Sequence, residues 1–357
     1  MAATNSPEEP ASPRNHAEAP AGVAVDEASG RPAAKRPKRR WWKRWLLRLG
    51  IAALALDVLV TAFSFGYNAA TTPHVKPPAG LSYVRTGDLD TRYRIWGTTG
   101  SPVVLVHGFA ETADTWDRMA RALARDHRVY AYDVDGFGYT GRHGPYTIDH
   151  LATQLLDFLG VMKITRPTLV GHSSGAAVIA RAALRAPGRV GGLMFLDGDA
   201  LSTSPGPPPA VRKYAFADPY RTTILRMVVL SDTVIKAIYN SQCGPACPRL
   251  DRAGVEQWRR PFQVPGAEHG VWQMMNGNVV GMSAKAVAGL RKVPVPKSVV
   301  FGAEDHVFAK KGAAQTAARI GAPAPTLIQH ARHLSMISHP AAVAAAVEAL
   351  ASRVATS

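Results

Sequence analysis

The feature that most constrains this chain is the segment Gly171-His172-Ser173-Ser174-Gly175, which lies between a short apolar run and an alanine-rich stretch. The run at 168–170 predicts a strand, and the stretch from 175 to 185 predicts a helix. Small residues at both ends of the segment allow a sharp turn, which holds the serine at its apex in a strained, exposed position. A hydroxyl presented beside the free N–H groups of a helix start has the properties of an acyl-transfer nucleophile.

Composition bounds the class of protein but does not name its partner. The chain has 357 residues, enough for one large α/β domain and additional segments, and a formal net charge of +16. Such a surface can attract anionic lipid, cell-wall polymer or nucleic acid, but the basic residues beyond residue 70 are scattered, which favours solubility as their role. The sequence contains no zinc-finger spacing, Walker loop or RNA-binding signature, so we expect no cofactor, no metal and no specific nucleic acid.

The N-terminal region predicts a membrane anchor. We expect a disordered, basic cytoplasmic tail over residues 1–44, a transmembrane helix over 45–67 and a linker over 68–79. Tryptophans and Lys/Arg crowd the N-terminal side of the apolar run, so the positive-inside rule places the N-terminus in the cytoplasm. Asp57 opposes insertion by about 2.5–3.5 kcal/mol, which the surrounding apolar residues offset. The alternatives are a buried helix of the soluble domain and a cleaved signal peptide; without a small-x-small site after the run, an uncleaved signal anchor is favoured.

This topology predicts a single-pass protein of the cell membrane whose larger domain lies outside the cytoplasm. The two cysteines, Cys243 and Cys247, could then close a small disulfide loop in an oxidising compartment, or they could remain free thiols. Metal binding at this pair is not expected, because no further cysteine supports a site with four ligands.

Strands and helices alternate downstream of residue 80. Apolar runs rich in β-branched residues are each followed by a helical pattern, after a hairpin over residues 83–96. This alternation predicts a mostly parallel sheet with helices on both faces and ligands at the carboxyl ends of its strands. The expected strands are 103–106, 129–132, 168–170, 190–196, 299–301 and 326–328, and the expected helices are 116–124, 148–159, 175–185, 310–319 and 340–351.

Five motifs at the ends of these strands resemble those of the α/β-hydrolases, over about residues 80–353. One is the serine turn from Gly171 to Gly175, and another is His107-Gly108-Phe109, which follows the strand at 103–106. The resemblance implies an α/β-hydrolase fold with an eight-stranded sheet, in which the backbone N–H groups of Phe109 and Ser174 form an oxyanion hole.

A third motif, Asp133 to Thr140, resembles a structural turn of the family. Asp135 stands where the family usually has proline, and Thr140 where it usually has serine. His172, beside the proposed nucleophile, is expected to be a packing residue of the serine turn.

The remaining two motifs supply an acid and a base. Gly302-Ala303-Glu304-Asp305 resembles the family's acid segment, with Asp305 favoured and Glu304 as the alternative. The later segment 331–334 resembles the base segment, and His333 is favoured over His330 because of its spacing to the helix that begins near residue 340. The order Ser173, Asp305, His333 is the family's order of nucleophile, acid and base. The base removes the serine proton, and the acid fixes the tautomer of the base.

Residues 199 to about 290 interrupt the alternation and match the position of the family's helical cap. Such caps cover the active site and shape the substrate pocket. The aromatic and methionine residues of this insertion either line an apolar acyl or alkyl pocket or form the core of the cap itself. They are Trp258, Phe262, Trp272, Met274 and Met275.

The sequence therefore predicts a membrane-tethered serine hydrolase that cleaves an ester or related acyl bond of a small, apolar substrate through an acyl-enzyme at Ser173. Carbon–carbon bond hydrolases and cofactor-free perhydrolases use the same triad and remain alternatives, whereas epoxide and haloalkane hydrolases use an aspartate nucleophile. A non-catalytic binding module and a surface-tethered polyanion binder are the alternatives from other classes.

Overall fold

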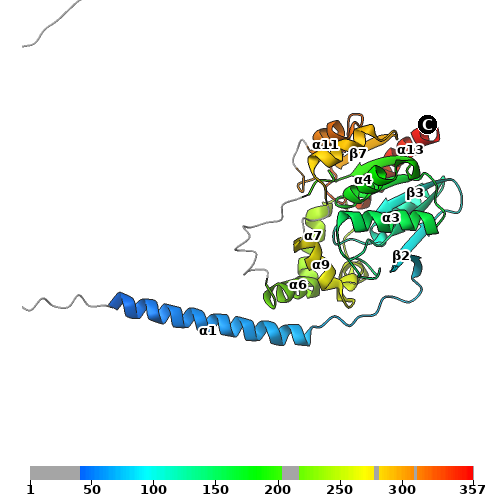
Figure 1. Ribbon diagram of the computed structural model, residues 1–357. Coiled ribbons are helices and arrows are strands. Elements are labelled where there is room, and N and C mark those ends of the chain that lie inside the picture. Colours follow the sequence, from blue (N-terminus) through cyan, green and yellow to red (C-terminus); the bar gives the residue numbers. More distant parts are fainter. Residues whose placement is uncertain (1–40, 203–216, 277–280, 309–311, 357) are drawn as a thin grey trace, which may run out of the picture. The chain divides into compact units, whose positions relative to one another are not determined.

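The computed structural model describes residues 41–202, 217–276, 281–308 and 312–356. Its centre is an eight-stranded sheet with the order β1-β2-β4-β3-β5-β6-β7-β8 (Figure 1). The pairs β1–β2 and β2–β4 are antiparallel and all others are parallel, which confirms the predicted fold class. The strands are β1 (Ser82–Thr86), β2 (Leu89–Trp96), β3 (Ser101–Val106), β4 (His127–Tyr132), β5 (Thr168–His172), β6 (Gly192–Leu196), β7 (Lys297–Gly302) and β8 (Thr326–Ile328).

Helices cover both faces of the sheet, and each face has its own apolar core. One core is formed with α3 (Ile148–Val161), α4 (Gly175–Arg185) and α11 (Gly312–Ile320), and Figure 1 shows α3 and α4 side by side. The other core is formed with α2 (Asp117–Leu123) and α13 (Pro340–Ala355).

Several predicted boundaries of these elements are wrong by a few residues. The strand expected from 190 begins at 192, because the N–H of Val190 closes a 3₁₀ turn onto Pro187 (η2, Pro187–Arg189). The helix expected from 116 is preceded by a separate 3₁₀ turn, η1 (Ala113–Trp116), capped by Thr112. The last helix continues to Ala355, because no glycine or proline interrupts it.

The described part of the insertion between β6 and β7 is mostly helical. It contains α6 (Tyr220–Leu230), α7 (Asp232–Cys243), α8 (Arg252–Arg259), η3 (Arg260–Gln263), α9 (Ala267–Asn276), α10 (Ala284–Ala288) and η4 (Gly289–Lys292). Cys243 and Cys247 form a disulfide at the end of α7, so the sequence alternative of two free thiols does not hold in this structure. We call the segment from α6 to α9 the cap.

The N-terminal helix, α1 (Trp41–Ala70), is 30 residues long and is long and apolar enough to cross a membrane. Its most apolar window has a mean hydropathy of 2.0, and none of that window is buried, unlike the core helix of a soluble protein. Residues 41–44, expected in the disordered tail, are helical, as are residues 68–70 of the expected linker. Tryptophan, lysine, arginine and alanine all continue a helix, which ends only before Pro73. Residues 1–40 of the expected tail lie outside the described residues.

Candidate active site

The turn after β5 holds Ser173 in a strained backbone conformation. Its φ is +50°, in the left-handed region, and its N–H donates to the Leu196 carbonyl at 3.0 Å. A Cβ on Gly171 would lie 2.5 Å from the Gly175 carbonyl oxygen, and one on Gly175 would lie 2.2 Å from that of Val106. Both glycines are therefore required for the close approach of β5, α4 and β3 that produces this turn.

The loop after β7 and the loop after β8 bring Asp305 and His333 together. The Nδ1 atom of His333 lies 2.9 Å from Oδ2 of Asp305, and only 9% and 2% of these side chains are exposed. The N–H of Val307 donates to the other Asp305 oxygen at 2.7 Å, which orients the carboxylate. Burial lowers the pKa of His333, although the hydrogen bond to Asp305 opposes this shift. The imidazole is therefore neutral near pH 7 and can accept a proton.

The two alternative residues lie elsewhere. Glu304 and His330 pair with each other at 3.3 Å, and their side chains are 47% and 84% exposed. Neither lines the cavity that contains Ser173.

Ser173 and His333 line one cavity of about 470 Å³ between the carboxyl ends of the strands and the cap. Phe109 also lines it, and most of the other lining residues are apolar side chains from the cap. Of the cap residues predicted to line a pocket or form a core, Trp258, Phe262 and Trp272 line the cavity, whereas Met274 is buried in the core. The side chain of Met275 lies outside the described residues. Among the described residues, no group of three or more His, Cys, Asp or Glu could hold a metal ion.

His107 fixes the loop that precedes the cavity. Its Nδ1–H donates to the Gly108 carbonyl at 2.8 Å, and its Nε2 accepts from the N–H of Val134 at 2.9 Å. A Cβ on Gly108 would lie 2.9 Å from Cβ of Ser173, so only glycine allows the loop to approach the serine. Phe109 follows at the cavity wall, and Ser174 is the residue before the first turn of α4. These positions are where the sequence predicted the oxyanion hole.

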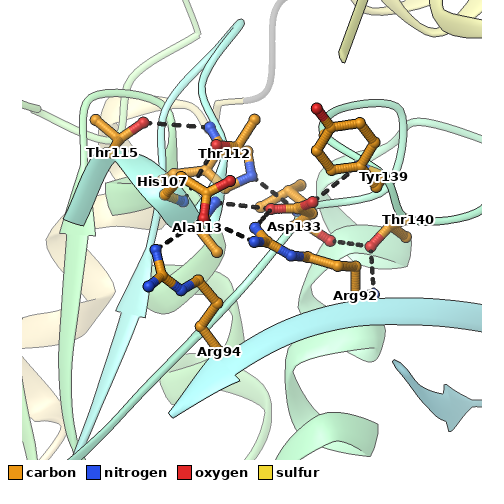
Figure 2. Close-up of polar contacts among 12 residues, drawn as sticks. Arg92, Arg94, His107, Thr112, Ala113, Thr115, Asp133, Tyr139 and Thr140 are labelled. Carbon is orange, nitrogen blue, oxygen red and sulfur yellow. Dashed lines mark hydrogen bonds and ion pairs between the residues drawn. The ribbon is translucent and has the colours of Figure 1, made fainter. Parts of the chain in front are cut away.

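The turn from Asp133 to Thr140 is a buried hydrogen-bond network that supports this loop (Figure 2). The Asp133 carboxylate accepts from the N–H groups of Ala113 at 2.7 Å and Tyr139 at 2.8 Å, and it pairs with Arg92 at 3.2 Å. The Thr140 hydroxyl donates to the Asp133 carbonyl and accepts from the Arg92 N–H. Threonine therefore makes the polar contacts that a serine hydroxyl could make here.

Asp135, which stands where proline is usual, is fully buried and lies 2.8 Å from Nε2 of His150. It also accepts from the N–H of Gly144 at 3.1 Å. The aspartate therefore replaces the rigidity of a proline by tying the turn to α3 and to the following loop.

Sequence reasoning missed a buried ion pair beside His333. His172 is indeed buried, but its Nδ1 lies 2.8 Å from Oε1 of Glu111 and its Nε2 lies 2.9 Å from the His333 carbonyl oxygen. Burial alone would lower the pKa of His172, but the Glu111 carboxylate outweighs it and raises the pKa to about 9. Glu111 was recognisable only as a carboxylate three residues after Gly108, and nothing in the sequence linked it to His172.

A second missed carboxylate is Asp197, at the carboxyl end of β6. It is fully buried, accepts from the Gly302 N–H at 2.6 Å and receives the Ser335 hydroxyl at 2.5 Å. Burial and the nearby charge of Asp305 raise its pKa to about 7. It braces the β7 and β8 loops that carry Asp305 and His333.

Comparison with known proteins identifies the family of the chain. Residues 103–346 match the Alpha/beta hydrolase family. The chain belongs to this family. A 2-hydroxy-6-oxo-6-(2'-aminophenyl)hexa-2,4-dienoic acid hydrolase of Metapseudomonas resinovorans is 28% identical over 270 residues, which cover 72% of this chain and 86% of that enzyme. A 2-hydroxy-6-oxo-2,4-heptadienoate hydrolase of Pseudomonas putida is 35% identical over 33% of this chain.

Several of these curated relatives are matched over less than half of their own length. Among solved structures, a serine hydrolase of carbazole degradation has a TM-score of 0.59 and 25% identity, covering 76% of this chain and 98% of that protein. A membrane phospholipase A has a TM-score of 0.62 with 20% identity, over 89% of this chain and 99% of that one, a likeness of fold. The predicted family and fold are thus confirmed.

Proposed function

We propose that this protein is a serine hydrolase that cleaves a carboxylic ester or a related acyl bond. The observation that carries the proposal is the buried Asp305–His333 pair, whose histidine lines the same cavity as the strained Ser173. A nucleophile, a base oriented by a carboxylate and an enclosed space for substrate are the parts that acyl transfer requires.

In the proposed mechanism, Oγ of Ser173 attacks the acyl carbon while Nε2 of His333 takes its proton, and Asp305 stabilises the resulting imidazolium. The carbonyl oxygen becomes an oxyanion that accepts hydrogen bonds from the N–H groups of Phe109 and Ser174. The C–O bond to the leaving group breaks as His333 returns the proton to that oxygen. Water then attacks the acyl carbon of the acyl-enzyme while His333 takes its proton. The bond to Oγ of Ser173 breaks as His333 returns the proton to that oxygen, which releases the acid and restores the serine.

The charges at the cavity favour an uncharged substrate. Glu111 is paired with His172, and Arg259 donates to the Val229 carbonyl and to the carboxylates of Glu256 and Asp232. All three guanidinium nitrogens of Arg259 are therefore engaged, and the rest of the wall is mostly apolar. An apolar acyl group matches such a wall better than an anion does.

Carbon–carbon bond hydrolysis is the second candidate. It is favoured by two relatives named as hydrolases of 2-hydroxy-6-oxo-dienoic acids, which are 28% and 35% identical to the matched parts of this chain. A dienoic acid carries a carboxylate, whereas the cavity wall is mostly apolar and its arginine, Arg259, is already paired with Glu256 and Asp232. We therefore place ester hydrolysis first.

We also propose that α1 anchors the protein in a membrane, with the N-terminus in the cytoplasm and the hydrolase domain outside. The exposed apolar surface of α1, the preceding basic block and the disulfide of the cap support this topology. After alkaline extraction, the full chain should remain in the membrane pellet, and external protease should digest the domain in intact spheroplasts. Release into the soluble fraction would contradict the anchor.

The catalytic proposal is tested with the full chain in detergent micelles, a fluorophosphonate probe, p-nitrophenyl esters and a dienoic acid substrate. Ser173→Ala should abolish labelling and turnover, and Asp305→Asn should lower kcat by about 10⁴. Glu304→Gln and His330→Gln are matched controls, since these residues pair at the surface, and both should retain wild-type rates. Labelling that survives in Ser173→Ala would refute the nucleophile, and faster cleavage of the dienoic acid than of any ester would favour the second candidate.

A further inference from the structure

The last turns of α1 are hydrogen-bonded to the first helix of the cap. The hydroxyl of Thr61 lies 2.5 Å from that of Tyr220, and the Asn68 amide donates to the Pro219 carbonyl at 2.9 Å. Thr223 donates to the Asn68 side chain at 3.0 Å. The start of α6 therefore lies along residues 61–68, a stretch of about 10 Å of helix.

The opposite side of α6 forms part of the wall of the active-site cavity. Leu225, Val228 and Val229 line the space that also contains Ser173 and His333. One short helix thus contacts the expected membrane anchor and the candidate site at once.

The side of α6 that carries the contacts with α1 also has apolar, exposed residues. Ile224, Met227 and Leu230 recur at a spacing of three and are 51%, 43% and 41% exposed. We call these three side chains the α6 stripe. They share an arc of the helix with Tyr220 and Thr223, the residues that contact α1, because positions three apart lie on one side of a helix.

The position of the contact along α1 indicates what covers the α6 stripe. Thr61 lies inside the expected membrane span of 45–67, and Asn68 lies one residue beyond it. A helix held beside these residues lies within the boundary between headgroups and acyl chains, where interfacial helices bury their apolar faces by about 5–10 Å. Exposed apolar residues at that depth face lipid rather than water.

We propose that α6 lies in the membrane interface as the wall between bilayer and active site, and that the substrate is a long-chain acyl ester of a membrane lipid. This inference rests on the proposed anchor and serine hydrolase activity. The lipid-facing side of α6 is the α6 stripe. The side of α6 that lines the cavity guides the acyl chain toward Ser173. Ile238 and Val307, which line the same cavity and are about half exposed, provide an apolar rim for the chain.

The first test uses the full chain and the double variant Ile224→Glu/Met227→Glu. In phosphatidylcholine vesicles, the variant should release fatty acid at least about tenfold more slowly than the wild type, because two charges replace apolar contacts with lipid. Its turnover of p-nitrophenyl acetate in detergent micelles should stay within about twofold, because neither side chain lines the cavity. Val161→Glu is the matched control, an exposed apolar residue at the end of α3, and should change neither rate.

Equal rates of lipid hydrolysis in the double variant and the wild type would overturn the inference, as would a wild type that cleaves soluble esters but no vesicle lipid. A wild type that turns over no ester and is not labelled by the probe would instead refute the proposed function.

A second measurement does not depend on activity. An environment-sensitive fluorophore attached through Met227→Cys should shift to the blue in vesicles, whereas one attached through Val161→Cys should not. The same emission from both positions would refute the membrane contact of α6.

Discussion

Replacing His172 by glutamine should move the acid limb of the pH–rate profile to higher pH. Both ring nitrogens of His172 face acceptors, the Glu111 carboxylate at 2.8 Å and the His333 carbonyl at 2.9 Å. Despite burial, the Glu111 carboxylate raises the pKa of His172 to about 9, so the ring is an imidazolium near neutral pH. The centroid of this ring lies 4.8 Å from that of His333. A positive charge at this distance disfavours a second positive charge on the base and lowers the pKa of His333.

The size of the effect follows from the distance. Two unit charges 4.8 Å apart interact by about 3.5 kcal/mol at an effective dielectric constant of about 20, or about 2.5 pKa units. This value is an upper bound, because the cavity admits solvent and Glu111 can take up a proton once His172 is gone. Asp305 and Glu111 also face His333 and both raise its pKa, so in His172→Gln their charges act without the opposing cation. We expect a rise of about 1–2 units.

The assay is kcat/KM for p-nitrophenyl acetate as a function of pH, because the acid limb reports the base of the free enzyme. The double variant His172→Gln/Glu111→Gln removes both charges of the pair, so its acid limb should lie between those of the wild type and the single variant. An acid limb in His172→Gln that stays in place or moves to lower pH, with the fold intact by circular dichroism, would refute the assignment of a permanent charge to His172.

Three further predictions concern stability. The raised pKa of Asp197 means that the folded state holds a proton that the unfolded state loses, so the free energy of unfolding should fall by up to about 4 kcal/mol between about pH 4 and pH 7; denaturant titrations should show this slope in the wild type and not in Asp197→Asn. Gly138→Ala should destabilise by about 3 kcal/mol or more, because φ is +57° and the new Cβ would lie 2.1 Å from an Asp133 oxygen; an unchanged thermal midpoint would contradict this. Replacing Cys243 and Cys247 by serine should lower the free energy of unfolding by about 2 kcal/mol, measured by denaturant titration without reductant. A wild type that unfolds at the same denaturant concentration with and without reductant would contradict this prediction.

The parts of this protein that the sequence predicted are those with strictly local requirements. The turn around Ser173 needs glycine at 171 and 175, because backbone oxygens lie within about 2.5 Å of any Cβ there, and this requirement is visible as a pattern. Asp305 and His333 were identifiable because each follows an apolar strand, and the ends of parallel strands meet at one edge of a sheet. Boundaries were less accurate, since α1 and α13 continue past their expected ends wherever no residue interrupts the helix.

The features that were not predicted depend on contacts between distant segments. Glu111 and His172 are 61 positions apart, and the sequence contains no pattern that assigns a charge partner to either residue. The same holds for Asp57, which appeared only as a cost to membrane insertion, whereas the hydroxyl of Tyr220 donates to it at 3.5 Å. A carboxylate in an apolar helix is more readily accommodated where a second helix supplies a donor. This contact is part of the same α1–α6 arrangement from which a lipid substrate was inferred. If it assists insertion, a Tyr220→Phe variant should insert less well than the wild type; equal insertion would show that Asp57 does not need this donor.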